Sequence, residues 1–85
     1  MGKHEKLIQK ILSGRQDTSI SFSETVSMLR ALDFSLRTKG SHHIFYKQDV
    51  EEIINIQPDG SKAKPYQVKQ IRDLMVKYRL EEKDE

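Results

Sequence analysis

The apolar residues near the start of the chain recur with the spacing of a helix. Over residues 4–13 they fall on one stripe, which holds Leu7, Ile8, Ile11 and Leu12. Gly14 follows directly and suits a helix C-cap. We therefore predict a helix over residues 4–13 and a loop over residues 15–20. Because a small fold needs every apolar face, we expect the stripe to cover the core, and a dimer or partner surface is the alternative.

A second helix is predicted from residue 21 to about residue 33. Ser21 and Glu24 have the spacing of a capping box, in which Ser21 caps the helix and Glu24 reaches back to it. The apolar positions predict an inner face formed by Phe22, Val26, Leu29 and Leu32, with Met28 on its flank.

From residue 35 the hydrophobic period changes to two, which is typical of strands. Three strands are predicted over residues 35–39, 41–47 and 52–57, and turn residues lie between them at Gly40-Ser41 and Gln48-Asp49. Pro58-Asp59-Gly60 ends the third strand. Short strands with tight connections predict an antiparallel meander.

The last predicted element is a helix that opens at Pro65, a residue favoured in the first turn. Its apolar face holds Val68, Ile71, Leu74, Met75 and Tyr78. The order α-α-β-β-β-α predicts an α+β two-layer sandwich, with a three-stranded antiparallel sheet, helices on one face and the other face open to solvent.

Composition narrows the class of protein. The 85 residues are 35% hydrophobic and 33% charged, so we expect a single domain with a thin core and a charged surface. The absence of cysteine excludes disulfides, thiol nucleophiles and cysteine-based zinc sites. No apolar run approaches the roughly 18–20 residues of a membrane span, and residues 1–6 do not resemble a signal peptide. A cytoplasmic protein without a membrane partner is therefore expected.

The net charge of +2 hides an uneven distribution of charge. Residues 60–80 sum to +5, between residues 21–59, which sum to −2, and residues 81–85, which sum to −3. The basic segment contains Lys62, Lys64, Lys69, Arg72, Lys77 and Arg79. Lys62 and Lys64 precede a helix N-terminus, which also favours anions. A phosphate backbone is the natural partner of such a cluster, and an ordinary solvated helix face is the alternative.

The most unusual stretch of the chain is Gly40-Ser41-His42-His43-Ile44-Phe45. Successive strand residues point to opposite faces, so a buried Phe45 places His42 on the open face, near the turn at Gly40. Imidazole is the side chain best suited to move protons near neutral pH, which makes His42 a candidate general acid or base. The alternative is a solvated or structural histidine. A metal site at His42 and His43 is disfavoured because the two side chains diverge.

This stretch, with Leu29-x-x-Leu32-Asp33-Phe34 before it and an apolar strand and basic helix after it, resembles the HicA family of toxins. These are the small ribonuclease partners of HicB antitoxins. The resemblance covers roughly residues 22–80 and implies a double-stranded-RNA-binding-domain-like fold that cleaves messenger RNA. It implies that His42 is the required histidine, that Gly40 and Ser41 shape the turn presenting it, and that Phe45 anchors the strand.

Residues 1–21 and 81–85 fall outside this resemblance, as an N-terminal helix-and-loop extension and an acidic tail. Two departures occur inside it. Many family members carry a Pro-x-His segment where this chain has Ile56-Gln57-Pro58-Asp59, and their last helix often opens with Gly-Thr rather than Pro65-Tyr66-Gln67.

The expected reaction needs no metal or cofactor, because the ribose 2′-hydroxyl is an internal nucleophile beside the phosphorus. The residues expected to bind RNA are Lys62, Lys64, Lys69 and Tyr66, helped by Arg37 and Lys39 from the first strand. The expected protein partner is an acidic HicB-like antitoxin. Two alternatives from other classes are a non-catalytic RNA-binding module and a protein-interaction domain.

Overall fold

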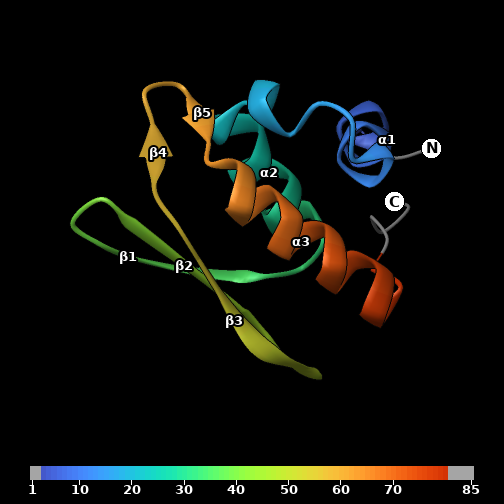
Figure 1. The fold of residues 1–85 in the computed structure, drawn as a ribbon. Helices are drawn as coiled ribbons and strands as arrows, with labels where there is room; N and C mark the ends of the chain where they lie inside the picture. Colours follow the sequence, from blue (N-terminus) through green and yellow to red (C-terminus); the bar gives the residue numbers. More distant parts are fainter. Residues whose placement is uncertain (1–2, 81–85) are drawn as a thin grey trace.

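The structure is a computed structural model that describes residues 3–80, so the predicted acidic tail lies outside the described residues. Its elements, in chain order, are α1 (Glu5–Ser13), a 3-10 turn η1 (Asp17–Ser19), α2 (Phe22–Ala31), β1 (Ser35–Lys39), β2 (His42–Lys47), β3 (Val50–Ile56), β4 (Pro58–Asp59), β5 (Lys62–Ala63) and α3 (Pro65–Tyr78). Helices α2 and α3 cover one face of the sheet, and α1 lies against them on the side away from the sheet (Figure 1). The predicted α+β sandwich with one open sheet face is confirmed.

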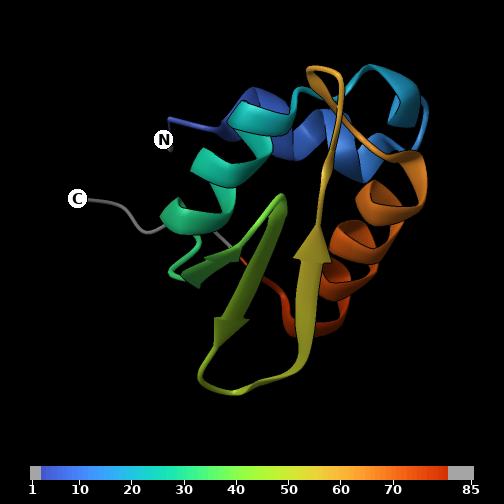
Figure 2. The ribbon, with the colours of Figure 1, turned by 90° about the vertical axis from the view of Figure 1, so that its left-hand side faces the viewer.

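The sheet has the order β1-β2-β3, and both pairings are antiparallel. Residues that pair across antiparallel strands share a face of the sheet. Phe45 pairs with Leu36 of β1 and with Ile54 of β3, and these side chains face the helices. His42 pairs with Lys39 on the opposite face, which Figure 2 views from the front.

The core joins both layers of the sandwich. Its fully buried side chains include Phe45, Ile54 and Ile56 from the sheet, Met28 and Leu29 from α2, and Val68 and Ile71 from α3. The predicted apolar face of α3 is confirmed, since Val68, Ile71, Leu74 and Met75 are buried and Tyr78 packs against the core.

The predicted inner face of α2 was partly wrong. The buried residues are Thr25, Met28, Leu29 and Leu32, whereas Phe22 and Val26 are only half-buried. Helix α2 packs against α1 as well as against the rest of the core, so more than one side of it is covered. The Thr25 hydroxyl donates to the Ser21 carbonyl at 2.7 Å, which satisfies this polar group inside the core.

The helix boundaries follow the predicted caps. Gly14 ends α1 in the left-handed conformation with φ of 70°, and the Ser21 hydroxyl accepts from the backbone N–H of Glu24 at 3.3 Å. The short hairpin β4–β5 was not predicted, because strands of two residues are too short to show a period. Within residues 3–80, no helix is long and apolar enough to cross a membrane.

The N-terminal segment belongs to the same core as the rest of the chain. Ile8, Ile11 and Ile20 are buried, which confirms the core-covering interpretation of the stripe; Leu12 at its edge is 38% exposed. The loop predicted over residues 15–20 contains the 3-10 turn and ends at Ile20, whose carbonyl accepts from the backbone N–H of Ala63 at 2.9 Å.

Arg72 of α3 adds polar contacts between this segment and the rest of the domain. The Arg72 guanidinium donates to both carboxylate oxygens of Asp17, at 2.9 and 3.1 Å, and to the Ile11 carbonyl at 3.1 Å. Both charged side chains are about one-fifth exposed, and the pair raises the pKa of Arg72. The positive charge of Arg72 is therefore paired with Asp17 within the fold.

Candidate functional site

His42 stands at the edge of the open sheet face, as the first residue of β2. The preceding turn needs Gly40, which has a φ of 61° in the left-handed region that other residues rarely adopt. The imidazole is exposed, while Phe45, three residues further along the strand, is fully buried. The turn and the strand alternation therefore present His42 as predicted.

Two amide side chains hold the His42 ring. Its Nδ1 lies 3.1 Å from Oδ1 of Asn55, and its Nε2 lies 3.1 Å from Nε2 of Gln57. The Gln57 amide nitrogen also donates to the Ser41 hydroxyl at 3.3 Å. Sequence reasoning missed Asn55 and Gln57, although the period of two puts both on the face of the sheet that is not occupied by the buried Ile54.

His43 points to the helix side of the sheet. Its ring meets the ring of Phe22 edge-on, with centroids 5.0 Å apart, and its Nδ1 lies 3.3 Å from the Ser41 carbonyl. The two neighbouring histidines therefore diverge, as the strand period predicts. Among the described residues, no group of three or more His, Asp or Glu side chains is placed to hold a metal ion.

Two basic residues share the face of His42. Lys39 is its direct partner across the β1–β2 pair, and Arg37 pairs with Ile44, the next residue on that face. Both side chains are exposed and neither forms an ion pair with another described residue. Both side chains are therefore placed where a polyanion bound beside His42 could contact them, as the sequence predicts.

The basic segment at residues 60–80 is not one continuous surface. Lys69 pairs with Asp73 at 2.9 Å, Arg72 with Asp17 at 2.9 Å, and Lys77 with Glu52 at 2.7 Å. Arg79 caps the far end of α3. Lys62 on β5 and Lys64 at the N-cap of α3 are the lysines of this segment that form no ion pair with another described residue.

The start of α3 reaches the His42 site through a buried glutamine. Gln67 is 3% exposed. In the orientation that satisfies both its amide atoms, it accepts from the Gln57 N–H at 3.2 Å and donates to the Gln57 carbonyl at 3.3 Å. Lys64 and Tyr66 lie in the same N-terminal part of α3. This contact brings that part of the helix toward Gln57.

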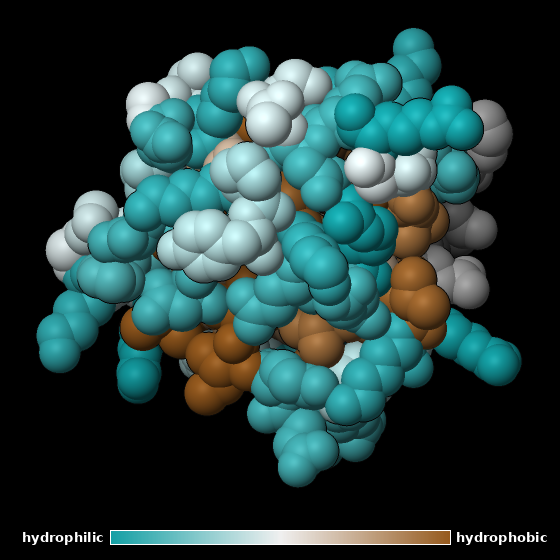
Figure 3. Space-filling model, in the orientation of Figure 1, coloured by the Kyte–Doolittle hydropathy of each residue, from teal (hydrophilic) through white to brown (hydrophobic). Residues whose placement is uncertain are grey.

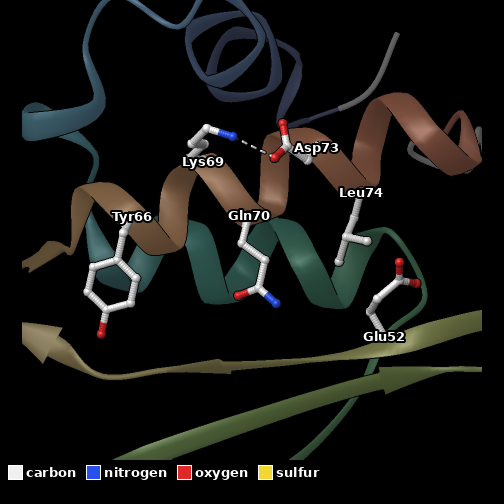
Figure 4. Close-up of a pocket in the computed structure, with 6 residues that line it drawn as sticks. All are labelled: Glu52, Tyr66, Lys69, Gln70, Asp73 and Leu74. Carbon is white, nitrogen blue, oxygen red and sulfur yellow. Dashed lines mark hydrogen bonds and ion pairs between the residues drawn. The ribbon is translucent and has the colours of Figure 1, made fainter.

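A hollow of about 360 Å³ lies between α3 and β3, on the helix side of the sheet (Figure 4). It is lined by Glu52, Tyr66, Lys69, Gln70, Asp73 and Leu74. Tyr66 is 67% exposed and points toward the strands, whereas Lys69 points away from the sheet to its partner Asp73. The structure therefore does not bring Lys69 to the face of His42.

Apolar surface is limited on the side of the molecule seen in Figure 3, which is mostly hydrophilic with small apolar patches. The exposed large apolar side chains of the sheet are Tyr46 at 45% and Ile53 at 59%. Tyr46 follows His42 and Ile44 at alternate positions of β2, so it shares the open face with them.

Glu52 is the acidic link between β3 and α3, outside the histidine site. Its carboxylate accepts from Lys77 at 2.7 Å and from the Tyr78 hydroxyl at 2.6 Å. The hydrogen bond from Lys77 and, second, the one from Tyr78 lower the pKa of Glu52 from its ordinary 4.5 to about 2. The same hydrogen bond with Glu52 raises the pKa of Lys77.

Acid should therefore weaken the fold through Glu52. A carboxyl group with a lowered folded pKa stabilises the protein above its unfolded pKa, and this stabilisation is lost as the pH falls from about 4.5 toward about 2. We expect urea midpoints of Glu52→Gln to lie below those of the wild type at pH 6 and to approach them near pH 2. Glu51→Gln, at the exposed neighbouring position, is the control. Parallel pH profiles for wild type and Glu52→Gln would contradict this role.

One of the three comparisons with known proteins gives a match, and it covers the greater part of the chain. A family model described as HicA toxin of bacterial toxin–antitoxin matches residues 22–79. The comparisons with curated proteins and with solved structures give no match. The matched range begins at the first residue of α2 and includes His42, Asn55 and Gln57, while α1 lies before it.

Proposed function

The chain belongs to the family of HicA toxins of bacterial toxin–antitoxin systems, and we propose that it is a metal-independent endoribonuclease that cleaves messenger RNA with His42 as general base. The observation that carries this proposal is the exposed His42 ring on the open sheet face, oriented by Asn55 and Gln57. Gly40 and Ser41 form the turn that presents the ring, and Phe45 fixes the strand beneath it.

The proposed reaction is an intramolecular transfer at phosphorus. His42 takes the proton of the ribose 2′-hydroxyl, the 2′-oxygen attacks the neighbouring phosphorus, and the bond from phosphorus to the 5′-oxygen breaks. The leaving 5′-oxygen takes a proton from water, and the protonated His42 gives its proton to the hydroxide so formed, which restores the neutral ring. The products are a 2′,3′-cyclic phosphate and a 5′-hydroxyl end. One positioned histidine supplies about 10²–10⁴-fold of rate, which makes this a slow enzyme.

A cleavage assay in EDTA tests the proposal. We expect the wild type to convert RNA to fragments with 2′,3′-cyclic phosphate ends, and His42→Ala to lose this activity. RNA with a single 2′-deoxyribose at the cleaved position should remain intact, since it lacks the nucleophile. Cleavage of that deoxy-substituted RNA would contradict the mechanism.

Arg37 and Lys39 are the cations that we propose to hold the RNA phosphates beside His42, with Lys62, Lys64 and Tyr66 extending the surface. Binding to single-stranded RNA weakens with salt in proportion to the number of neutralised phosphates. We expect the double variant Arg37→Gln/Lys39→Gln to bind more weakly and to have a shallower slope of log K against log salt, by about 1.4.

The matched control for this double variant is Lys3→Gln/Lys6→Gln. It removes the same charge from exposed positions before and within α1, away from the sheet. Salt titrations by fluorescence anisotropy measure both slopes on a labelled RNA that carries 2′-deoxyribose at the cleaved position. Equal slopes for the two double variants would contradict a specific role for Arg37 and Lys39.

Membership of the family implies an antitoxin partner. We propose that this partner is a HicB-like protein that covers His42 with an acidic surface, since opposite charge on the two proteins speeds association. The unpaired cations Arg37 and Lys39 beside His42 fit such a surface.

A further inference from the structure

We infer that Asn55 and Gln57 are positioning residues that fix the neutral His42 ring as its Nδ1–H tautomer and leave Nε2 as the basic nitrogen. The inference rests on the two 3.1 Å contacts of the ring in the free protein. Only its kinetic consequence rests on the proposed function.

The assignment follows from what each partner atom can do. The Oδ1 atom of Asn55 is a carbonyl oxygen and only accepts, so the Nδ1 atom of His42 must carry the hydrogen. The Nε2 atom of Gln57 belongs to an amide NH₂ group and only donates, so the Nε2 atom of His42 must offer its lone pair. Both contacts select the same tautomer, which is set by the hydrogen bonds of the ring.

Gln57 is itself held in place from two sides. Its second amide hydrogen has a partner in the Ser41 hydroxyl at 3.3 Å, so the two donors of the NH₂ group are used by Ser41 and His42. Its backbone is paired with the buried Gln67 amide at 3.2 and 3.3 Å. The chain of contacts therefore runs from the core through Gln67 and Gln57 to the Nε2 atom of the exposed ring.

The two amides act differently on the protonated ring. Asn55 accepts from Nδ1–H in both the neutral and the charged state, whereas the donor of Gln57 faces a nitrogen that must lose its lone pair on protonation. When the ring is protonated, the Gln57 contact is therefore lost while the Asn55 contact remains. The charged residue paired with His42 from β1 is Lys39, and the residues that contact the ring from β3 and directly after it, Asn55 and Gln57, are uncharged.

During the proposed reaction, the 2′-hydroxyl replaces Gln57 as the partner of Nε2. Gln57 keeps its contact with Ser41, and Asn55 keeps the ring from turning while the proton moves. Asn55 is therefore expected to affect the rate of the chemical step more than the binding of RNA, because its hydrogen bond lies on the far side of the ring from the substrate.

The tautomer is measured directly, without RNA. Long-range ¹H–¹⁵N spectra of the ¹⁵N-labelled full chain at pH 8.5 distinguish protonated from bare ring nitrogens, and the His42→Gln variant identifies the His42 signals. We expect Nδ1 protonated and Nε2 bare in the wild type. Asn55→Leu should weaken this preference, because only the Gln57 contact then selects the tautomer. A wild-type ring protonated at Nε2 would overturn the inference.

A carboxylate at position 55 provides a second readout. Asn55→Asp places a negative charge against Nδ1–H, which favours imidazolium over the neutral ring. Because the base must be neutral, the acid limb of the cleavage profile should move to higher pH. Asn55→Leu should lower kcat at least about tenfold with little change in KM.

Gln48→Leu is the matched control, since it removes an exposed amide from the turn at the far end of the sheet. It should leave both the His42 titration and cleavage unchanged. If the spectra show the Nδ1–H tautomer but no variant cleaves RNA, the proposed function fails and the positioning role stands. An Asn55→Asp protein with the wild-type His42 pKa and pH profile would overturn the positioning role alone.

Discussion

Replacing His42 with alanine is expected to lower the rate of RNA cleavage by about 10²–10⁴-fold and to leave the fold intact. The side chain is exposed on the open sheet face and its hydrogen bonds go to two surface amides, so its loss removes no core contact. Cleavage rates in EDTA measure the first effect, and thermal unfolding followed by circular dichroism measures the second.

The neighbouring histidine provides the control for this experiment. His43 lies on the helix side of the sheet against Phe22, and His43→Phe keeps an aromatic ring in that contact. We expect it to cleave RNA like the wild type. Equal cleavage by wild type and His42→Ala would remove His42 from the mechanism, and steeply salt-dependent RNA binding without cleavage would favour a non-catalytic RNA-binding module.

The placement of His42 was predictable from sequence because it depends on a local rule. Side chains alternate between the two faces along a strand, so one residue that must be buried decides the face of all the others in β2. Phe45 is that residue, and it is fully buried. Gly40 marks the turn for an equally local reason, its positive φ. The order of elements follows from the same periods.

The partners of His42 were not predictable in the same way. Alternation places Asn55 and Gln57 on the correct face, but their contact with the ring depends on the register between β2 and β3, in which Ile44 pairs with Asn55. Register is set by the packed core and the turn as a whole. A pattern along one strand does not contain it.

The basic segment at residues 60–80 was predicted to form one surface, and this was wrong for a related reason. The +5 of residues 60–80 counts charges along the chain, whereas the fold pairs Arg72 with Asp17, which lies 55 positions earlier, and Lys77 with Glu52 of β3. Ion pairs of such long range appear only when helices and strands have packed. Among residues 3–80, the cations that share the open face with His42 and form no ion pair are Arg37 and Lys39 of β1, where the sequence shows no cluster of basic residues.

Deleting residues 1–20 is expected to unfold the protein or to remove most of its free energy of unfolding. The deletion removes three buried side chains, Ile8, Ile11 and Ile20. Truncation of a buried isoleucine to alanine costs about 2–5 kcal/mol, while the whole domain has about 4–13 kcal/mol at typical values per residue. It also leaves Arg72 without Asp17 and the backbone N–H of Ala63 without the Ile20 carbonyl. Urea unfolding of the chain 21–85 measures the loss.

This expectation separates two interpretations of the N-terminal segment. The family match begins at residue 22, which by itself suggests that α1 is a removable extension. Ile8 and Ile11 of α1, and Ile20 after it, are instead part of the buried core, and α1 packs against both α2 and α3. Leu12→Ala is the matched control, since this side chain of α1 is already 38% exposed and should cost under about 1 kcal/mol. A truncated protein with the wild-type urea midpoint would show that residues 21–85 fold as an independent unit to which α1 adds no stability.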